Sequence, residues 1–106
     1  MWPPRDKKTA MSVGRAEEIA ANALAFLAAD AGRMMLFLSV TGVGLDEVRR
    51  EAGSRRMLTA VLDHLVNDES LLLVFSSSIG LPPEDIEPAR NVLAKDGPET
   101  PARAQE

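Results

Sequence analysis

The chain has 106 residues, of which 45% are apolar and none is cysteine, and its formal net charge is −4 at pH 7. This size and apolar share fit one small globular domain and exclude a fully disordered chain. The absence of cysteine excludes disulfides, thiolate metal sites and a cysteine nucleophile, and it fits a reducing cytoplasm. The acidic balance disfavours nucleic acids and anionic membranes as partners, and no apolar run is long enough to span a bilayer.

Both ends of the chain lack helical periodicity and are rich in proline and charge. We therefore predict disordered tails over residues 1–14 and 95–106, on either side of a single helical domain over 15–94. Whether Met1 or Met11 begins the natural protein stays open at this point.

The first half of the domain has the pattern of three helices. Apolar residues recur at helical spacing over 15–29, where the many alanines favour a helix. Asp30 interrupts this pattern and is a good N-cap, so a second helix is predicted from there to Gly42, which suits a left-handed C-terminal cap. A short third helix is expected over 45–52. The residues that share one face within these helices are Ile19, Ala20, Ala23, Leu24, Leu27, Met34, Phe37, Leu38, Thr41 and Val48.

The second half predicts three more helices. A helix over 54–67 carries an apolar stripe, and the apolar residues then restart in a new phase in a helix over 68–79 that ends before Gly80. Five consecutive apolar residues in this fifth helix indicate that it is central and buried. A sixth helix is expected after Pro82, bent or delayed by Pro88. The residues expected to be almost fully buried are Leu62, Leu65, Leu72 and Phe75.

An internal repeat relates the two halves. Residues 20–48 align without gaps with residues 58–86, which gives six identities, among them both cap aspartates and both cap glycines. Two helical hairpins with the same capping chemistry would share some of these matches without common descent, so both explanations stay open. A duplication would give two three-helix units, over 16–53 and 54–94. The expected fold is all-α, a compact bundle of five to six short helices in which the two units pack face to face.

Several motifs of this chain resemble one protein family. "LDHLVNDESLLLVF" and "IGLPPEDI", together with "FLAAD" and a "TG" turn, are similar to the pattern of short alphaproteobacterial proteins known only as a domain of unknown function. The resemblance covers about residues 16–93 and implies a helical fold without implying any chemistry. The chain departs from the family pattern at Gly32 and Gly44, so we expect weaker helix starts there.

Few residues suggest catalysis or metal binding. His64 is the only histidine, and Asp63, although adjacent, points about 100° away from it on a helix. One histidine with carboxylates makes a poor metal site, and no motif positions a base beside the serines at 76–78. We expect no catalytic residue, metal site or cofactor, and an enzyme built around His64 is the weakest of three functional hypotheses.

Four arginines flank the turn at Gly53 and could contact phosphate, as in a helix-turn-helix-like nucleic-acid binder. They are Arg49, Arg50, Arg55 and Arg56. Three carboxylates share the same short helix, so a mixed, solvated surface is the simpler interpretation. Nucleic-acid binding is therefore the alternative hypothesis.

The leading hypothesis is a small, non-catalytic protein-interaction or accessory module. Its candidate surface is Leu36, Leu38 and Val40, because the aligned residues of the second repeat are partly polar. These side chains either are covered within the monomer or form a surface for a protein partner or for self-association. Their solvent accessibility distinguishes the two cases. The methionines Met34, Met35 and Met57 are expected to fill the core.

Overall fold

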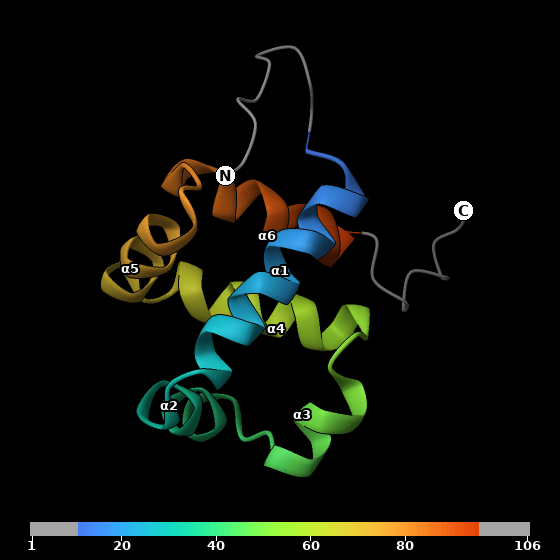
Figure 1. Ribbon diagram of the computed structural model, residues 1–106. Coiled ribbons are helices and arrows are strands. Elements are labelled where there is room, and N and C mark those ends of the chain that lie inside the picture. Colours follow the sequence, from blue (N-terminus) through green and yellow to red (C-terminus); the bar gives the residue numbers. More distant parts are fainter. Residues whose placement is uncertain (1–10, 96–106) are drawn as a thin grey trace, which may run out of the picture.

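The computed structural model describes residues 11–95, and within this range it contains helices and no strand. The predicted all-α bundle is confirmed (Figure 1). The elements in chain order are α1 (Val13–Ala28), α2 (Ala31–Thr41), α3 (Leu45–Glu51), α4 (Arg55–Val66), α5 (Glu69–Ile79), the 3-10 helix η1 (Pro83–Asp85) and α6 (Ile86–Lys95).

The helix boundaries follow from capping residues that the sequence predicts. The carboxylates of Asp30 and Asp68 each accept a hydrogen bond from the backbone N–H three residues later, at the starts of α2 and α5. Gly42 and Gly80 end the same helices with φ of 76° and 70°, as predicted. Gly44, at the start of α3, offers no side-chain cap, in agreement with the weaker start expected there.

The centre of the molecule is formed by α1, α4 and α6, which pack against one another (Figure 1). The alanines on the buried stripe of α1 leave room for its neighbours to approach closely. The fully buried larger apolar side chains come from five of the helices. They are Ile19, Leu27, Phe37, Val61, Leu62, Leu65, Phe75, Ile86 and Leu93.

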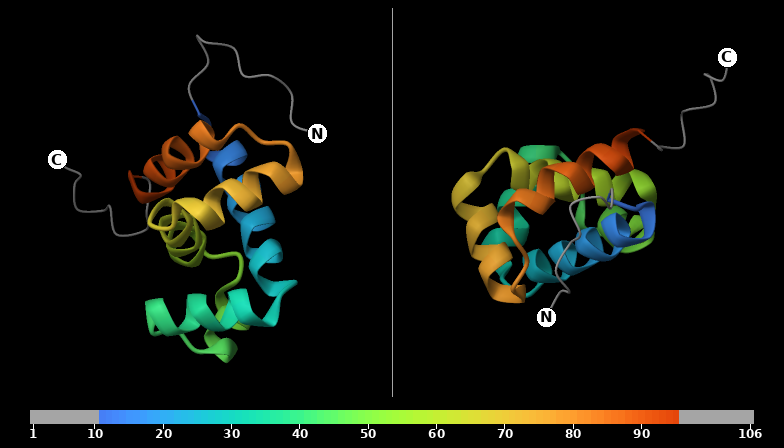
Figure 2. Two further views of the ribbon diagram at one scale, coloured as in Figure 1. Left: turned by 90° about the vertical axis from the view of Figure 1, so that its left-hand side faces the viewer. Right: turned by 90° about the horizontal axis from the view of Figure 1, so that it is seen from above.

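The helices α2 and α5 lie on one side of this centre. Figure 2 (left) shows them running in opposite directions across the face toward the viewer. Each packs an aromatic ring against the long helix of the other half: Phe37 of α2 contacts His64 of α4, and Phe75 of α5 contacts Phe26 of α1, both with ring centroids 5.3 Å apart. In the repeat alignment Phe26 corresponds to His64 and Phe37 to Phe75. The two contacts therefore join aligned positions of the two halves.

Ion pairs connect the helices at the edge of the core. The carboxylate of Glu17 on α1 and the guanidinium of Arg55 on α4 lie 3.2 Å apart. The guanidinium of Arg15 lies 3.4 Å from the carboxylate of Asp85, which is 1% exposed and fixes η1 against α1. Removing one partner of such a buried pair leaves an uncompensated charge, which is strongly destabilising.

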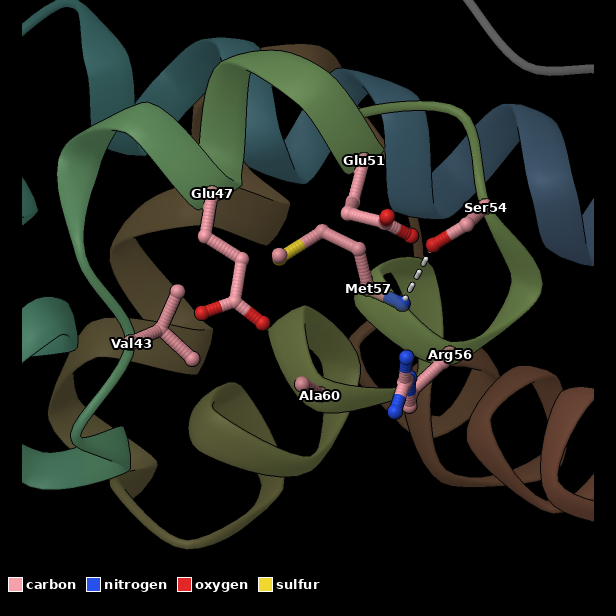
Figure 3. A pocket seen from close by; sticks show the side chains of 7 residues that line it. All are labelled: Val43, Glu47, Glu51, Ser54, Arg56, Met57 and Ala60. Atoms are coloured by element: carbon pink, nitrogen blue, oxygen red, sulfur yellow. Dashed lines mark hydrogen bonds between the residues drawn. The ribbon is translucent and has the colours of Figure 1, made fainter.

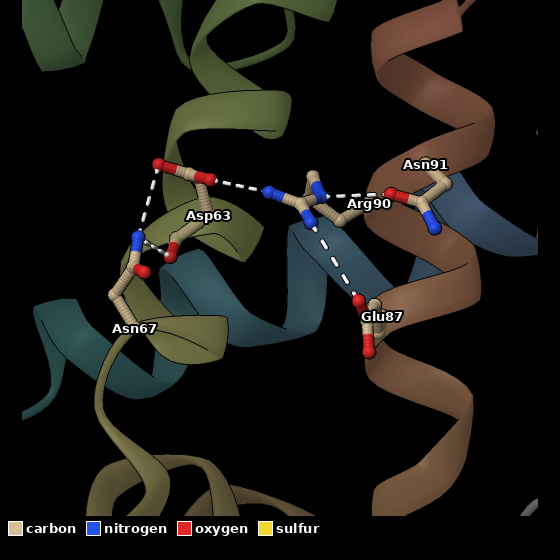
Figure 4. A network of polar contacts seen from close by, with 5 residues as sticks. All are labelled: Asp63, Asn67, Glu87, Arg90 and Asn91. Carbon is tan, nitrogen blue, oxygen red and sulfur yellow. Dashed lines mark hydrogen bonds and ion pairs between the residues drawn. The ribbon is translucent and has the colours of Figure 1, made fainter.

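A more exposed polar network joins α4 to α6 (Figure 4). Arg90 donates to a carboxylate oxygen of Asp63 at 2.6 Å and to the side-chain oxygen of Asn91 at 3.0 Å. The side chain of Asn67 donates to the backbone carbonyl of Asp63 at 2.9 Å, in addition to the bond that this carbonyl accepts from the backbone N–H of Asn67. This network gives a structural role to Asp63, which is adjacent to His64 in the sequence.

The expectation that the fifth helix is central and buried is wrong. In α5 the side chains of Leu73 and Val74 are 45% and 48% exposed, and Leu72 is only partly buried. The helix lies at the edge of the bundle and packs against α4 and η1, with Phe75 against α1. The neighbours of a helix at the edge of a bundle cover only one of its sides, whatever its composition. Leu62, Leu65 and Phe75 are fully buried, as predicted.

The N-terminal boundary also differs from the expectation. Met11 is buried, and Ser12 caps α1 by accepting a hydrogen bond from the backbone N–H of Arg15. Residues 11–14 thus belong to the folded domain, while the rest of the predicted N-terminal tail, and all of the C-terminal one after Lys95, lie outside the described residues. Pro88 lies in the first turn of α6, where proline is tolerated.

Within residues 11–95, no single helix combines the length and the apolar character needed to cross a membrane. Among these helices, only α1 and α2 taken together have the required length and apolar character, and the angle between them is 113°.

Replacing Gly80 by alanine should lower the free energy of unfolding by about 1 kcal/mol. A Cβ at this position would meet no atom within 4 Å, so the cost comes from the left-handed backbone conformation alone. Urea unfolding of the variant measures it. Gly53 is the matched control, because it also has open space around it and its φ is not positive. Equal effects at the two positions would contradict this explanation.

Leu62→Ala should lower the free energy of unfolding by about 2–5 kcal/mol, because the side chain is fully buried in α4 and its removal leaves a cavity. Chemical denaturation measures this value. Leu73→Ala on the exposed side of α5 should cost much less. A loss below about 1 kcal/mol for Leu62→Ala would contradict the full burial of this side chain, because the transfer free energy of the deleted atoms is lost even if the cavity collapses.

Candidate functional site

The candidate surface on α2 is exposed in large part. Met35, Leu36 and Val40 are 67%, 48% and 65% exposed, and we refer to these three residues as the α2 face. Met34 and Phe37 point the other way and are buried. Leu38, which the sequence included in the surface, is half-buried and packs against the core, and Met35, which was expected to fill the core, is exposed instead. Of the three candidate residues, Leu36 and Val40 are therefore exposed and Leu38 is not, and the expectation that Met35 fills the core is wrong.

A hollow of about 420 Å³ lies beside the α2 face. One wall consists of Leu36 and Val40, and the other consists of the junction between α4 and α5. At this junction α4 ends and Asp68 immediately caps α5, so four consecutive residues, 67–70, line the hollow. The lining residues are Leu36, Val40, His64, Asn67, Asp68, Glu69 and Ser70.

His64 lines the hollow and is 7% exposed. Its ring packs edge-on against Phe37, and its buried Nε2 atom has no hydrogen-bond partner among the described residues. Burial lowers the pKa of His64 below its ordinary value of 6.5, while the carboxylates of Asp68 and Asp63 act in the opposite direction. The imidazole is therefore neutral at pH 7. Within residues 11–95, no group of three or more histidines and carboxylates is placed to hold a metal ion.

The four arginines near the third helix do not act as one group. Arg55 lies 3.2 Å from Glu17 on α1, and Arg49 lies 3.6 Å from Asp46 within α3. Arg50 and Arg56 are exposed. The helix α3 thus carries a mixture of positive and negative charges instead of a uniform basic face.

A second, smaller cavity of about 90 Å³ lies between α3 and α4 (Figure 3). Glu47 and Glu51 approach it from α3, and Met57 and Ala60 from α4. Arg56 also lines this cavity, so the carboxylates that accompany the arginines in the sequence accompany them in space as well. Its size is below that of ordinary ligand pockets.

The serines at 76–78 have structural positions. Ser78 donates to the backbone carbonyl of Phe75 at 2.7 Å, which is the local bonding typical of a serine at a helix end. Ser76 is 2% exposed in the core.

Sequence reasoning missed the polar wall of the hollow. Asp68 was recognised as a cap, and Glu69 and Ser70 have no distinctive pattern. Their proximity to Val40 depends on how α2 packs across α4, which is a tertiary contact. The available signal was the helical phase of α2, because a buried Met34 and Phe37 leave Leu36 and Val40 at the flank of the buried stripe.

His64→Phe should reduce the loss of stability on acidification. Because the pKa of His64 is lower in the folded protein than in the unfolded one, its contribution to stability is complete above about pH 6.5 and declines as pH falls through the folded pKa. A phenyl group removes this proton linkage. Unfolding measured from pH 7.5 to pH 5 should show a shallower decline for the variant than for wild type. Parallel pH profiles would contradict the assignment.

Comparison with known proteins agrees with the motif pattern. Residues 14–96 match a family described as "Protein of unknown function (DUF3572)". No curated protein and no solved structure matches the chain. The matched region contains all of α2 to α6, and with them both walls of the hollow. The protein belongs to the DUF3572 family.

Proposed function

We propose that this protein is a small, non-catalytic protein-interaction module that binds its partner through the α2 face and the adjoining hollow. The observation that carries the proposal is the exposure of Val40, at 65%, next to Leu36 at 48% on the wall of a 420 Å³ hollow. A contiguous apolar surface that borders a concave site is typical of a binding site.

The fold itself does not require apolar residues at these positions. Ser39 is exposed on the same turn of α2 as Leu36 and Val40, so a polar side chain is compatible with the helix there. Covering a valine or leucine that is fully exposed would contribute about 1.5–3 kcal/mol, and these partly exposed side chains contribute a share of that to a complex. Stability of the monomer gains little from them, so binding is the better explanation of the α2 face.

Nucleic-acid binding through Arg49, Arg50, Arg55 and Arg56 is the weaker alternative. The proximity of Arg55 to Glu17 and of Arg49 to Asp46 argues against it. If it were correct, binding to duplex DNA would weaken steeply with salt, because phosphate contacts release counterions.

Two broader expectations accompany the proposal. The motif resemblance supports an alphaproteobacterial origin, and the absence of cysteine supports a cytoplasmic location. Either a different protein or a second copy of this chain would satisfy the proposal as partner.

Val40→Asp should abolish the association and leave the fold intact, because a carboxylate at a desolvated apolar contact is costly. The measurement has two parts: quantitative co-purification from the native cell, and the sedimentation of the purified protein. Ser39→Asp is the matched control, since it adds the same charge to the same turn of α2 outside the hollow. Both variants share any unfavourable interaction with the helix C-terminus.

The proposal requires a partner that Val40→Asp loses and Ser39→Asp keeps. Circular dichroism and thermal unfolding confirm that both variants are folded. A partner retained by both variants, or lost equally from both, would place the interaction elsewhere on the molecule.

A further inference from the structure

We infer that the segment that fills the hollow is amphipathic and basic: its apolar side chains cover Leu36 and Val40, and a lysine or arginine lies against Asp68 and Glu69. This inference rests on the proposed function and names the chemistry of the partner. The partner is thus a protein segment with a lysine or arginine beside its apolar anchors.

The charges around the hollow favour a cation. Asp68 and Glu69 are both on its wall, and no lysine or arginine is among its lining residues. Asp68 also caps α5, so one of its oxygen atoms is engaged with the backbone N–H of Leu71. A carboxylate can accept several hydrogen bonds, so this cap leaves capacity for a cationic donor.

The helix ends add to the negative potential. Both α2 and α4 end beside the hollow, since Val40 lies in the last turn of α2 and Asn67 directly follows α4. A helix C-terminus carries partial negative charge that lysine or arginine commonly offsets. The last turn of α2 contains no basic residue, and that of α4 contains only His64, which is neutral at pH 7.

His64 adds a buried polar group to the wall of the hollow. It is more than nine-tenths buried, it lines the hollow, and its Nε2 has no hydrogen-bond partner within residues 11–95. A buried polar atom without a partner is costly.

The other half of the molecule shows a cation at the equivalent place. There the guanidinium of Arg33 lies over the ring of Phe26, 4.3 Å from its centroid. In the repeat alignment Phe26 corresponds to His64 and Arg33 to Leu71. The first half thus supplies a cation from its own chain, whereas the second half has leucine at that position and lacks one.

The shape of the site fits a short helical segment. One wall is apolar and the other is acidic, so a partner must present both kinds of side chain on nearby turns. An amphipathic helix does this with apolar anchors at i, i+3, i+4 and i+7 and basic residues beside them. A hollow of about 420 Å³ lies within the range of ordinary binding pockets.

The test uses two blocked peptides of about four helical turns each. They have the same leucine spacing, and their remaining residues are lysine in one and glutamate in the other. Each is titrated into the ¹⁵N-labelled full-length protein at physiological ionic strength. The lysine peptide should shift the amide resonances of Leu36, Val40 and residues 67–70, and the glutamate peptide should not bind.

Two charge reversals, one beside the hollow and one away from it, provide a matched pair of variants. Glu69→Lys should weaken binding of the lysine peptide about tenfold, whereas Glu84→Lys should change it less than about twofold. Both residues are exposed acids in the first turn of a helix, and only Glu69 lines the hollow. The two variants therefore carry the same net charge and differ in position only.

Several results would overturn the inference. They are equal binding of the two peptides, no binding of the lysine peptide at about millimolar concentration, shifts confined to other surfaces, or equal effects of the two charge reversals. A dimer of the chain that Val40→Asp abolishes would identify a second copy as the occupant and would overturn it as well. If a natural partner is lost with Val40→Asp but is insensitive to Glu69→Lys, the proposed function stands and only the basic character of the partner is refuted.

Discussion

The arrangement of this protein depends on the close packing of α1 against α4 and α6. Ala16, Ala20 and Ala23 of α1 are all fully buried, so α1 presents a nearly flat surface to its neighbours. Larger side chains there would separate the three central helices, and the cost of such overpacking is typically about 1–3 kcal/mol. Because α1, α4 and α6 already pack against one another, α2 and α5 pack at the side of these three helices. Each of them buries only one of its own faces there.

The exposed apolar residues are a consequence of this constraint combined with the small size of the domain. Helices α2 and α5 have 11 residues each and carry apolar side chains on more than one side. A domain of this size buries a limited part of its surface and has no further layer to cover the outer sides. The two helices nevertheless differ. The outer side of α2 ends in Val40 beside a hollow, whereas the corresponding position of α5 is Ser78, whose hydroxyl bonds to its own helix.

The features that could be predicted from the sequence are those that depend on local chemistry. Asp30 and Asp68 begin helices, and Gly42 and Gly80 end them, because capping and positive φ impose a residue type on a position. Burial could be predicted where a helix has a narrow stripe of apolar residues, as for Leu62 and Leu65 of α4. These local rules were enough for the all-α fold and for nearly all of its helix boundaries.

The sequence did not reveal which side of an apolar helix its neighbours cover. Five consecutive apolar residues in α5 suggested a central helix, and the exposure of Leu73 and Val74 arises from its place at the edge of the bundle. Likewise the site was predicted only on α2. Its second wall, at Asp68 and Glu69, comes close to Val40 through tertiary packing, which no periodicity encodes.

The equivalence of Phe26 and His64 bears on why the hollow exists. Phe26 and Phe75 show that a phenyl ring fits this kind of contact, so phenylalanine would be a compatible and more apolar choice at position 64. The chain instead keeps an imidazole there, with a buried nitrogen that lacks a partner within residues 11–95 and a pKa lowered by burial. Such a residue contributes less to stability than its apolar counterpart, and proteins tolerate costs of this kind mainly at functional sites. Position 64 is therefore one place where the aligned halves differ in a way that bears on binding, because His64 lines the hollow.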